Sequence, residues 1–315
     1  MNSPSRMSRE DAVTASPRQK AQETQHLPPP SPPPLPSEDD RKPSPLPVWL
    51  QLRIKASALL NRSRRHGPGN VVVLPFNKIA KLNVSVTEIA AMNFVRANTS
   101  IPVPEILEVH YDAKFEGFAN IVMTKLAGDD LADVIQDMSD AEVKSVVKEL
   151  SGYMKQLRRF DKDIGGNAPA IGGLGGIPGY DSRIASIPFG PFATMADFHT
   201  YLRLREPIED WILEPDVMAV HGKPEGTYKV KLTHGDIAPR NIRVKRGKIT
   251  GLIDWEFAGW YPEYWEYTRM FFPGERPYLK NWYNAIEEED GIGKYKTERK
   301  AEEAIWSRLG PFGFE

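Results

Sequence analysis

The sequence predicts an α+β fold in which a small strand-rich half is followed by a larger helical half. Between residues 71 and 124, short runs of β-branched residues alternate with turn signals and enclose a single helix. After Gly128 the pattern changes, because apolar residues from Val143 to Leu157 recur with helical spacing. We therefore expect the two halves to join near residues 126–129.

Length, charge and composition limit the classes of protein to which the chain can belong. Its 315 residues suffice for one large domain or two modest ones. With 41 Lys and Arg against 42 Asp and Glu, nothing in the charge favours nucleic acid or an anionic membrane as a partner. The lack of cysteine excludes disulfides, thiolate catalysis and Cys-ligated zinc. No run of about 18 apolar residues and no secretory signal is present, so we expect a cytoplasmic protein.

Residues 1–47 differ from the rest in composition. They hold 12 of the 28 prolines and no aromatic residue. Such a segment buries too little apolar surface to offset its chain entropy, so we expect a disordered Pro-rich tail. The run from Pro28 to Pro36 favours polyproline II and could bind an SH3- or WW-type partner, although a solvated tail is the simpler expectation.

The strand-rich half should contain four strands and one helix. Pro75-Phe76-Asn77 is a turn signal between the first two strands. Ser85 and Glu88 have capping-box spacing, which predicts that the helix begins there. We expect strands at 71–74, 78–84, 106–111 and 119–124, and the helix through about Asn98.

The helical half begins with a second capping box, Ser139 with Glu142, which should start the helix that runs through Leu157. The Gly-rich run 165–179 follows this helix rather than a strand, so we expect a loop and not a dinucleotide-binding fingerprint. Residues 195–215 and 279–309 are expected to be helical.

A β-hairpin is predicted between Ile242 and Leu252, with Arg246-Gly247 as its two-residue turn. In that register Lys245 faces Lys248, and Asn241 faces Leu252. Asn241 and Asp254 then lie at the same open end of the hairpin.

The residues around this hairpin carry the strongest chemical signal. An amide oxygen from Asn241 and a carboxylate from Asp254 are hard oxygen ligands that suit Mg²⁺. Asp236 lies five residues before Asn241 on the entering loop, where it could take a proton from a hydroxyl group. Two carboxylates and an amide around magnesium are the minimal set for phosphoryl transfer from a nucleotide.

His234-Gly235-Asp236 followed by Asn241, with Ile253-Asp254-Trp255 downstream, resembles the aminoglycoside phosphotransferase/choline kinase-like family of the protein-kinase-like fold. The resemblance implies a two-lobed α+β fold with a small strand-rich N-lobe and a larger helical C-lobe. It also implies that Asp236 is the catalytic base, with Asn241 beside it on the catalytic loop, and that Asn241 and Asp254 bind Mg²⁺. His234 would brace this loop.

The same resemblance assigns the nucleotide site. Lys81 would pair with the α- and β-phosphates and be held by Glu88, with Lys78 as the rival lysine. Alternatively, Lys81 is a charged residue of an edge strand, and Glu88 closes the capping box. The hinge that meets the adenine would be formed by Met123, Thr124, Lys125 and Leu126. The implied division is a tail at 1–47, an N-lobe at 48–126 and a C-lobe at 127–315.

The implied reaction moves the γ-phosphoryl group of ATP, or of GTP, to a hydroxyl of a small molecule, with Mg²⁺ as cofactor. A choline-type or protein-directed kinase would share this metal site. A non-catalytic pseudokinase adaptor is the other alternative, because the only candidate for a Gly-rich phosphate loop is 66–70, which is short and contains a proline.

Further segments extend the resemblance to the phosphotransferase-enzyme-family proteins of filamentous fungi. These are residues 99–104, 190–192 and 261–267. Six Trp and Tyr residues from Trp255 to Tyr267, with Glu256, Glu263 and Glu266 among them, could hold a cationic acceptor by cation–π contacts. A plain hydrophobic core is the simpler explanation of this cluster.

Overall fold

The computed structural model describes residues 41–44, 46–60, 70–111, 117–162, 170–272 and 274–310. The expected tail up to residue 40 and most of the candidate Gly-rich loop, residues 66–69, lie outside the described residues. Contacts with the folded part begin before residue 48, since the Ser44 N–H donates to the Tyr111 carbonyl at 3.3 Å. Among the described residues, no helix is long and apolar enough to cross a membrane.

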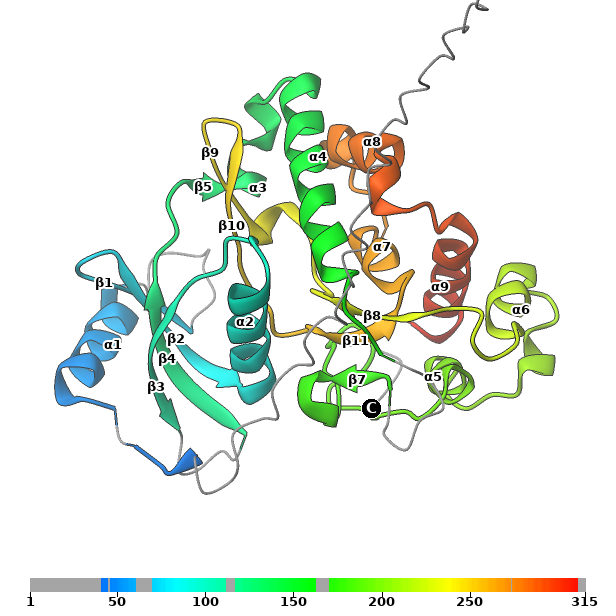
Figure 1. Ribbon diagram of the computed structural model, residues 1–315, viewed down its shortest axis with the longest axis horizontal. Coiled ribbons are helices and arrows are strands. Elements are labelled where there is room, and N and C mark those ends of the chain that lie inside the picture. The colour runs from blue at the N-terminus through cyan, green and yellow to red at the C-terminus, as the bar shows by residue number, and fades with distance from the viewer. Residues whose placement is uncertain are drawn as a thin grey trace, which may run out of the picture.

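The N-terminal region is built on an antiparallel sheet in the order β1-β2-β4-β3. Its strands are β1 (Val71–Leu74), β2 (Lys78–Ser85), β3 (Ile106–Tyr111) and β4 (Phe118–Thr124), all close to the predicted bounds. Helix α1 (Val48–Leu60) covers one face and α2 (Val86–Asn98) covers the other (Figure 1). Neighbouring residues of β4 show this division, because Val122 joins the cluster with Leu50 of α1, whereas Ile121 joins the main core with Ile89 of α2.

The predicted hairpin is present, with one change of register. Strands β9 (Ile242–Lys245) and β10 (Lys248–Leu252) turn at residues 246–247, and Lys245 faces Lys248 as expected. A register shift between Ile249 and Gly251 places Leu252 opposite Ile242 instead of Asn241. The predicted pairing of Asn241 with Leu252 is therefore wrong by one residue, because the prediction assumed a regular ladder without a bulge. The short strand β5 (Asp129–Asp130) completes this sheet in the order β10-β9-β5.

The C-terminal region is mostly helical and surrounds a second small sheet (Figure 1). Its helices are α3 (Leu131–Val134), α4 (Asp140–Leu157), α5 (Met195–Leu202), α6 (Pro215–His221), α7 (Trp265–Met270), α8 (Lys280–Glu288) and α9 (Lys296–Leu309). The sheet has the order β6-β8-β11-β7, with β6 (Asp161–Lys162), β7 (Gly172–Gly173), β8 (Val230–Thr233) and β11 (Gly259–Pro262). The main hydrophobic cluster runs through both regions and fixes them against each other.

Two of the expected long helices are interrupted. The stretch 195–215 ends as an α-helix at Leu202, where Leu204 and Arg205 adopt positive φ and Pro207 cannot donate a backbone hydrogen bond. The stretch 279–309 divides into α8 and α9, because Gly293 has a φ of 90°, which no helix accommodates.

The Gly-rich run was expected to be a loop throughout. In its described part, Gly172 and Gly173 instead form β7 and pair with Trp260 and Gly259 of β11. Local sequence gives no sign of this pairing, since it depends on a strand more than 80 residues away.

Candidate active site

A chain of ion pairs joins the N-terminal region to the end of the hairpin. Lys81 on β2 contacts the Glu88 carboxylate of α2 at 2.7 Å and the Asp254 carboxylate at 2.8 Å. Lys81 is only 8% exposed and Glu88 2%. Burial by itself would lower the pKa of Lys81, but Glu88 and Asp254 outweigh burial and raise that pKa. The structure thus joins Lys81, rather than Lys78, to the glutamate.

Glu88 does not close the capping box that its spacing suggests. Its backbone N–H donates to the Ser85 Oγ at 3.1 Å, so the serine half of the motif is present. The Glu88 carboxylate turns instead to Lys81. The capping contact and the ion pair with Lys81 are alternatives for one carboxylate, and in the structure the carboxylate makes the ion pair.

Asp254 is held in an unusual backbone conformation. Its φ is 68°, a left-handed value that Asp tolerates better than most residues with a Cβ. The preceding residue, Ile253, donates its N–H to the Asn241 carbonyl at 3.0 Å. The hairpin therefore places Asp254 next to Asn241, as predicted for two residues at its open end. The register of the hairpin differs from the predicted one by one residue.

The loop before the hairpin is braced by His234. The His234 Nδ1 accepts the Asp236 N–H at 3.2 Å, and Nε2 lies 3.1 Å from the Ile253 carbonyl, to which it can donate. Burial lowers the pKa of His234, which favours the neutral ring that these two contacts require. Gly235 has a φ of 80°, and a Cβ there would lie 2.6 Å from the Phe257 carbonyl oxygen. Only glycine fits between His234 and Asp236.

Glu266 holds the backbone of the same loop by hydrogen bonds, a role that the sequence did not suggest. This α7 carboxylate accepts the N–H groups of His234 at 2.6 Å and Gly235 at 3.0 Å. Burial raises the pKa of Glu266 to about 7 despite these hydrogen bonds. The sequence grouped Glu266 with the aromatic cluster as an acceptor ligand, but the structure places it behind the loop.

Asp236 is 5% exposed, and both of its carboxylate oxygens are engaged. Oδ1 accepts from Arg183 at 3.0 Å and from Arg240 at 2.6 Å. Oδ2 accepts from Arg240 and from the Asn241 amide nitrogen, each at 2.7 Å. Arg183 is itself held by Asp181 and lies over the Phe257 ring. Sequence reasoning missed both arginines, because an arginine in a loop carries no signal of what it faces.

The donor set near Asp254 fits a hard divalent cation. The Asn241 amide nitrogen is turned toward Asp236, which leaves the amide oxygen as its free ligand atom. Glu88, Asp254 and Glu256 place ligand oxygens within 4.8 Å of one another. Burial raises the pKa of Glu256 to about 7, and Asp254 adds to this effect. An amide and clustered carboxylates match the oxygen ligands that Mg²⁺ takes. Glu256 is thus a third candidate ligand, which the sequence had placed with the acceptor.

The expected hinge residues follow one another at the end of β4. Met123 is buried and pairs with Ile79 of β2. The Lys125 N–H donates to the Asn77 carbonyl at 2.8 Å, and its carbonyl accepts from the Asn77 side chain at 2.9 Å. The N–H of Lys125 is therefore already used, although its carbonyl keeps a second lone pair. Leu126 lies against Gly251 of β10.

The aromatic residues after Asp254 form core rather than a ligand cage. Trp255, Tyr261, Tyr264, Trp265 and Tyr267 have no exposed surface, and Trp260 is 4% exposed. The simpler of the two explanations is therefore confirmed, and this cluster offers no face to a cationic acceptor.

Comparison with known proteins places the chain in a family. The phosphotransferase enzyme family (APH) matches residues 61–303, and the chain belongs to this family. The fold is similar to that of a thermostable mutant of aminoglycoside phosphotransferase APH(4)-Ia in a ternary complex with AMP-PNP and hygromycin B. The TM-score is 0.50 and the identity 17%, over 76% of this chain and 81% of that chain.

A second solved structure, the GDP and kanamycin complex of APH(2")-IIia, gives a TM-score of 0.50 at 13% identity, over 84% of this chain and 90% of that chain. No curated protein is significantly similar in sequence. The matches establish the kinase-like α+β fold, with its strand-rich N-terminal and helical C-terminal regions, as the sequence predicted.

Proposed function

We propose that the protein transfers the γ-phosphoryl group of ATP, with GTP as the alternative donor, to a hydroxyl of a small molecule. The observation that carries the proposal is the connection from Glu88 through Lys81 to Asp254. It brings a buried cation and a carboxylate from opposite regions of the chain to one point. Asn241 lies beside this point, because its carbonyl accepts the N–H of Ile253, the residue before Asp254. The Asn241 amide in turn donates to the Asp236 carboxylate.

Each side chain has a defined task in this proposal. Lys81, oriented by Glu88, neutralises the donor phosphates. Asn241 and Asp254, with Glu256 beside them, would hold Mg²⁺, which when bound would neutralise charge on the phosphates. The hinge residues Met123, Lys125 and Leu126 would meet the base, with the Lys125 carbonyl rather than its N–H as the available polar group.

The transfer itself needs a positioned acceptor. The acceptor oxygen forms a bond to the γ-phosphorus while the bond from that phosphorus to the bridging oxygen breaks and the nucleoside diphosphate leaves. Asp236 takes the hydroxyl proton.

The division into an N-lobe at 48–126 and a C-lobe at 127–315 is part of the proposal. We also propose that the protein is cytoplasmic and has no nucleic acid or membrane partners.

Thermal unfolding with and without Mg-ATP tests the nucleotide half of the proposal. A ligand at 100 times its dissociation constant adds about 2.7 kcal/mol, which raises the unfolding temperature by several degrees. We expect a magnesium-dependent shift that disappears in Asp254→Ala. Asp290→Ala is the matched control, because Asp290 is 89% exposed and pairs only with Lys294 in the described part of the chain.

Turnover tests the other half. Asp236→Ala should keep the Mg-ATP shift and lose phosphoryl transfer. Retained transfer in this variant would overturn the assignment of the base. If no nucleotide shifts the wild type, the phosphotransferase is refuted and the non-catalytic adaptor takes its place.

A further inference from the structure

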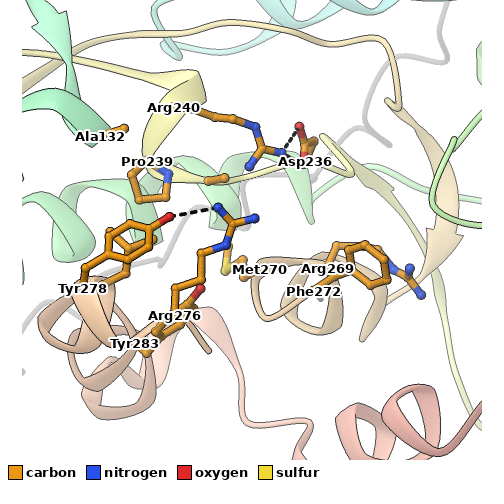
Figure 2. Close-up of a pocket in the computed structure, with 12 residues that line it drawn as sticks. Ala132, Asp236, Pro239, Arg240, Arg269, Met270, Phe272, Arg276, Tyr278 and Tyr283 are labelled. Carbon is orange, nitrogen blue, oxygen red and sulfur yellow. Dashed lines mark hydrogen bonds and ion pairs between the residues drawn. The ribbon is translucent and has the colours of Figure 1, made fainter. Parts of the chain in front are cut away.

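A pocket in the C-terminal region opens directly beside Asp236. It encloses about 540 Å³ of empty space, part of it continuous with solvent. Its charged lining residues are Asp236, Arg240, Arg269 and Arg276, so within the described lining there are three arginines and a single carboxylate (Figure 2). Because the pocket adjoins Asp236, the proposed function assigns the acceptor to it.

The three arginines are not equivalent. Arg269 is 2% exposed, pairs with Glu302 and stacks 3.8 Å from the Trp265 ring centroid, so its charge is neutralised within the core. The Arg276 side chain is different, because it donates to the Tyr278 hydroxyl at 2.9 Å and has no carboxylate within ion-pair distance in the described part of the chain. Arg240 has a side chain that is 58% exposed. Figure 2 shows the guanidinium groups of Arg240 and Arg276 directed into the same space.

The charge of Asp236 is already balanced without Arg276. Arg240 contacts both of its oxygens, and Arg183 contacts one of them. Arg183 is in turn matched by Asp181. Asp181 and Asp236 are thus paired with Arg183 and Arg240, and Arg276 adds a third guanidinium that contacts neither carboxylate, so these five groups carry an excess of positive charge.

The remaining wall is apolar or aromatic. Met270, Phe272, Leu279 and Tyr283 line the space opposite the catalytic loop. Such a wall favours a compact hydrocarbon or aromatic body over a large polyhydroxylated one.

Resting on the proposed function, we propose that the acceptor is a hydroxyl compound that also carries an anionic group, a carboxylate, phosphate or sulfate, on a compact apolar body. Its anionic group binds Arg276 and Arg240, and its hydroxyl reaches Asp236. A guanidinium forms strong charge-assisted hydrogen bonds with such oxyanions. A polycationic amino sugar would instead meet two guanidinium groups at close range, and like charges at such a distance repel.

The hydrogen bonds of Asp236 support an anionic acceptor independently. A general base needs a free oxygen within reach of the hydroxyl proton, and in this structure both oxygens of Asp236 are occupied. An oxyanion that draws Arg240 toward itself replaces Asp236 as the partner of that guanidinium. A neutral or cationic acceptor supplies no such replacement.

Three matched probes test this inference: para-(hydroxymethyl)benzoate, para-(hydroxymethyl)benzamide and para-(hydroxymethyl)benzylamine. They share one aromatic body and one primary alcohol and differ in charge. Binding to the full chain is measured by calorimetry or ligand-observed NMR at millimolar concentration. We expect the benzoate to bind about tenfold tighter than the amide, the size of one charge-assisted hydrogen bond, and the benzylamine to bind weakest.

Variants of Arg276 establish where the preference arises. Arg276→Gln should remove most of the preference for the benzoate, Arg276→Lys should restore part of it, and Arg276→Glu should favour the benzylamine. The side chain is exposed, so these changes should leave the fold intact. The control is Arg53→Gln, the same change at an exposed position of α1, which should keep the full preference.

The outcomes separate this inference from the proposed function. Equal binding of the three probes, no binding, a preference for the benzylamine, or a benzoate preference that survives Arg276→Gln would each overturn the anionic acceptor. With the Mg-ATP shift intact, any of these leaves the phosphotransferase standing. A benzoate preference in a protein that shows no Mg-ATP shift overturns the pocket as an acceptor site and the phosphotransferase with it.

Discussion

Helices α2 and α4 begin with the same motif, Ser-x-x-Glu, and use its glutamate in opposite ways. At α4 the box is complete, because the Glu142 N–H donates to Ser139 Oγ and the Ser139 N–H donates back to the Glu142 carboxylate at 2.9 Å. At α2 Ser85 makes its half of the box, but Glu88 bonds to Lys81 at 2.7 Å. A local sequence pattern therefore determines where a helix begins, but it does not determine which partner the glutamate of the motif binds.

Burial explains the difference. Glu142 is on the surface, where its carboxylate accepts from the N–H and the hydroxyl of Ser139. Glu88 is 2% exposed and lies beside the buried ammonium of Lys81. An unpaired buried charge costs several kcal/mol, whereas a helix cap contributes about 1 kcal/mol. The larger effect decides the geometry, and it converts a capping residue into part of the candidate active site.

The largest effect is expected for Glu88→Gln. Removing one partner of a buried ion pair costs about 3–5 kcal/mol, and Asp254 still contacts Lys81, so we expect about 3 kcal/mol of destabilisation. Denaturant unfolding measures it. The same variant should lose the Mg-ATP-dependent thermal shift. Glu142→Gln, the identical change at the identical motif position, is the control, and equal losses in the two variants would contradict the contrast.

A third carboxylate extends the comparison. Glu266, like Glu142, accepts backbone N–H groups, but burial raises its pKa to about 7. The folded state thus keeps a proton that the unfolded state loses near the ordinary value of 4.5. The stabilisation from Glu266 is fully present below that value and falls as the pH rises to 7.

Comparison of the wild type with Glu266→Gln should show this directly. The difference in their free energies of unfolding should change by up to about 3 kcal/mol between pH 4.5 and 7. The wild type should become less stable relative to the variant as the pH rises. Urea titrations at a series of pH values measure it. A difference that stays constant over this range would show that burial does not control the charge of Glu266.

Ser85→Ala and Ser139→Ala should each cost about 1 kcal/mol, because each serine caps its helix. The double-mutant cycles should differ. Ser139 and Glu142 should be coupled, since they bond reciprocally, whereas Ser85 and Glu88 should be nearly additive, since the Glu88 carboxylate lies elsewhere. Coupling of the same size at both helices would mean that Glu88 also closes its box in solution.

The smallest effect is expected for Glu142→Gln. The hydrogen bonds from Ser139 lower the pKa of Glu142, so its contribution to stability is present above the ordinary glutamate range and is lost as the pH falls through the lowered value. At neutral pH the variant should be slightly less stable, and on acidification the difference should disappear. Thermal unfolding of both proteins at neutral and at acidic pH measures this difference in stability. A difference that grows in acid would contradict the lowered pKa of Glu142.

Much of the fold could be predicted from local signals. The strands of the N-terminal region, the start of α2 at Ser85 and the hairpin turn at residues 246–247 all follow from periodicity, capping and turn chemistry. The broken helices could not be predicted. Leu204 and Arg205 adopt positive φ, which a run of helix-forming residues does not reveal.

The candidate site divides in the same way. The sequence by itself determined that Asp236, Asn241 and Asp254 belong together, because a two-residue turn brings the ends of a hairpin to one place. The family resemblance implied that Glu88 holds Lys81, and the tertiary structure decided between this pairing and the capping box. Only the tertiary structure decided that Glu266 holds the backbone of the loop at residues 234–235, and that Arg240 and Arg276 face one pocket. The burial that makes each charge need its partner exists only after the chain has folded.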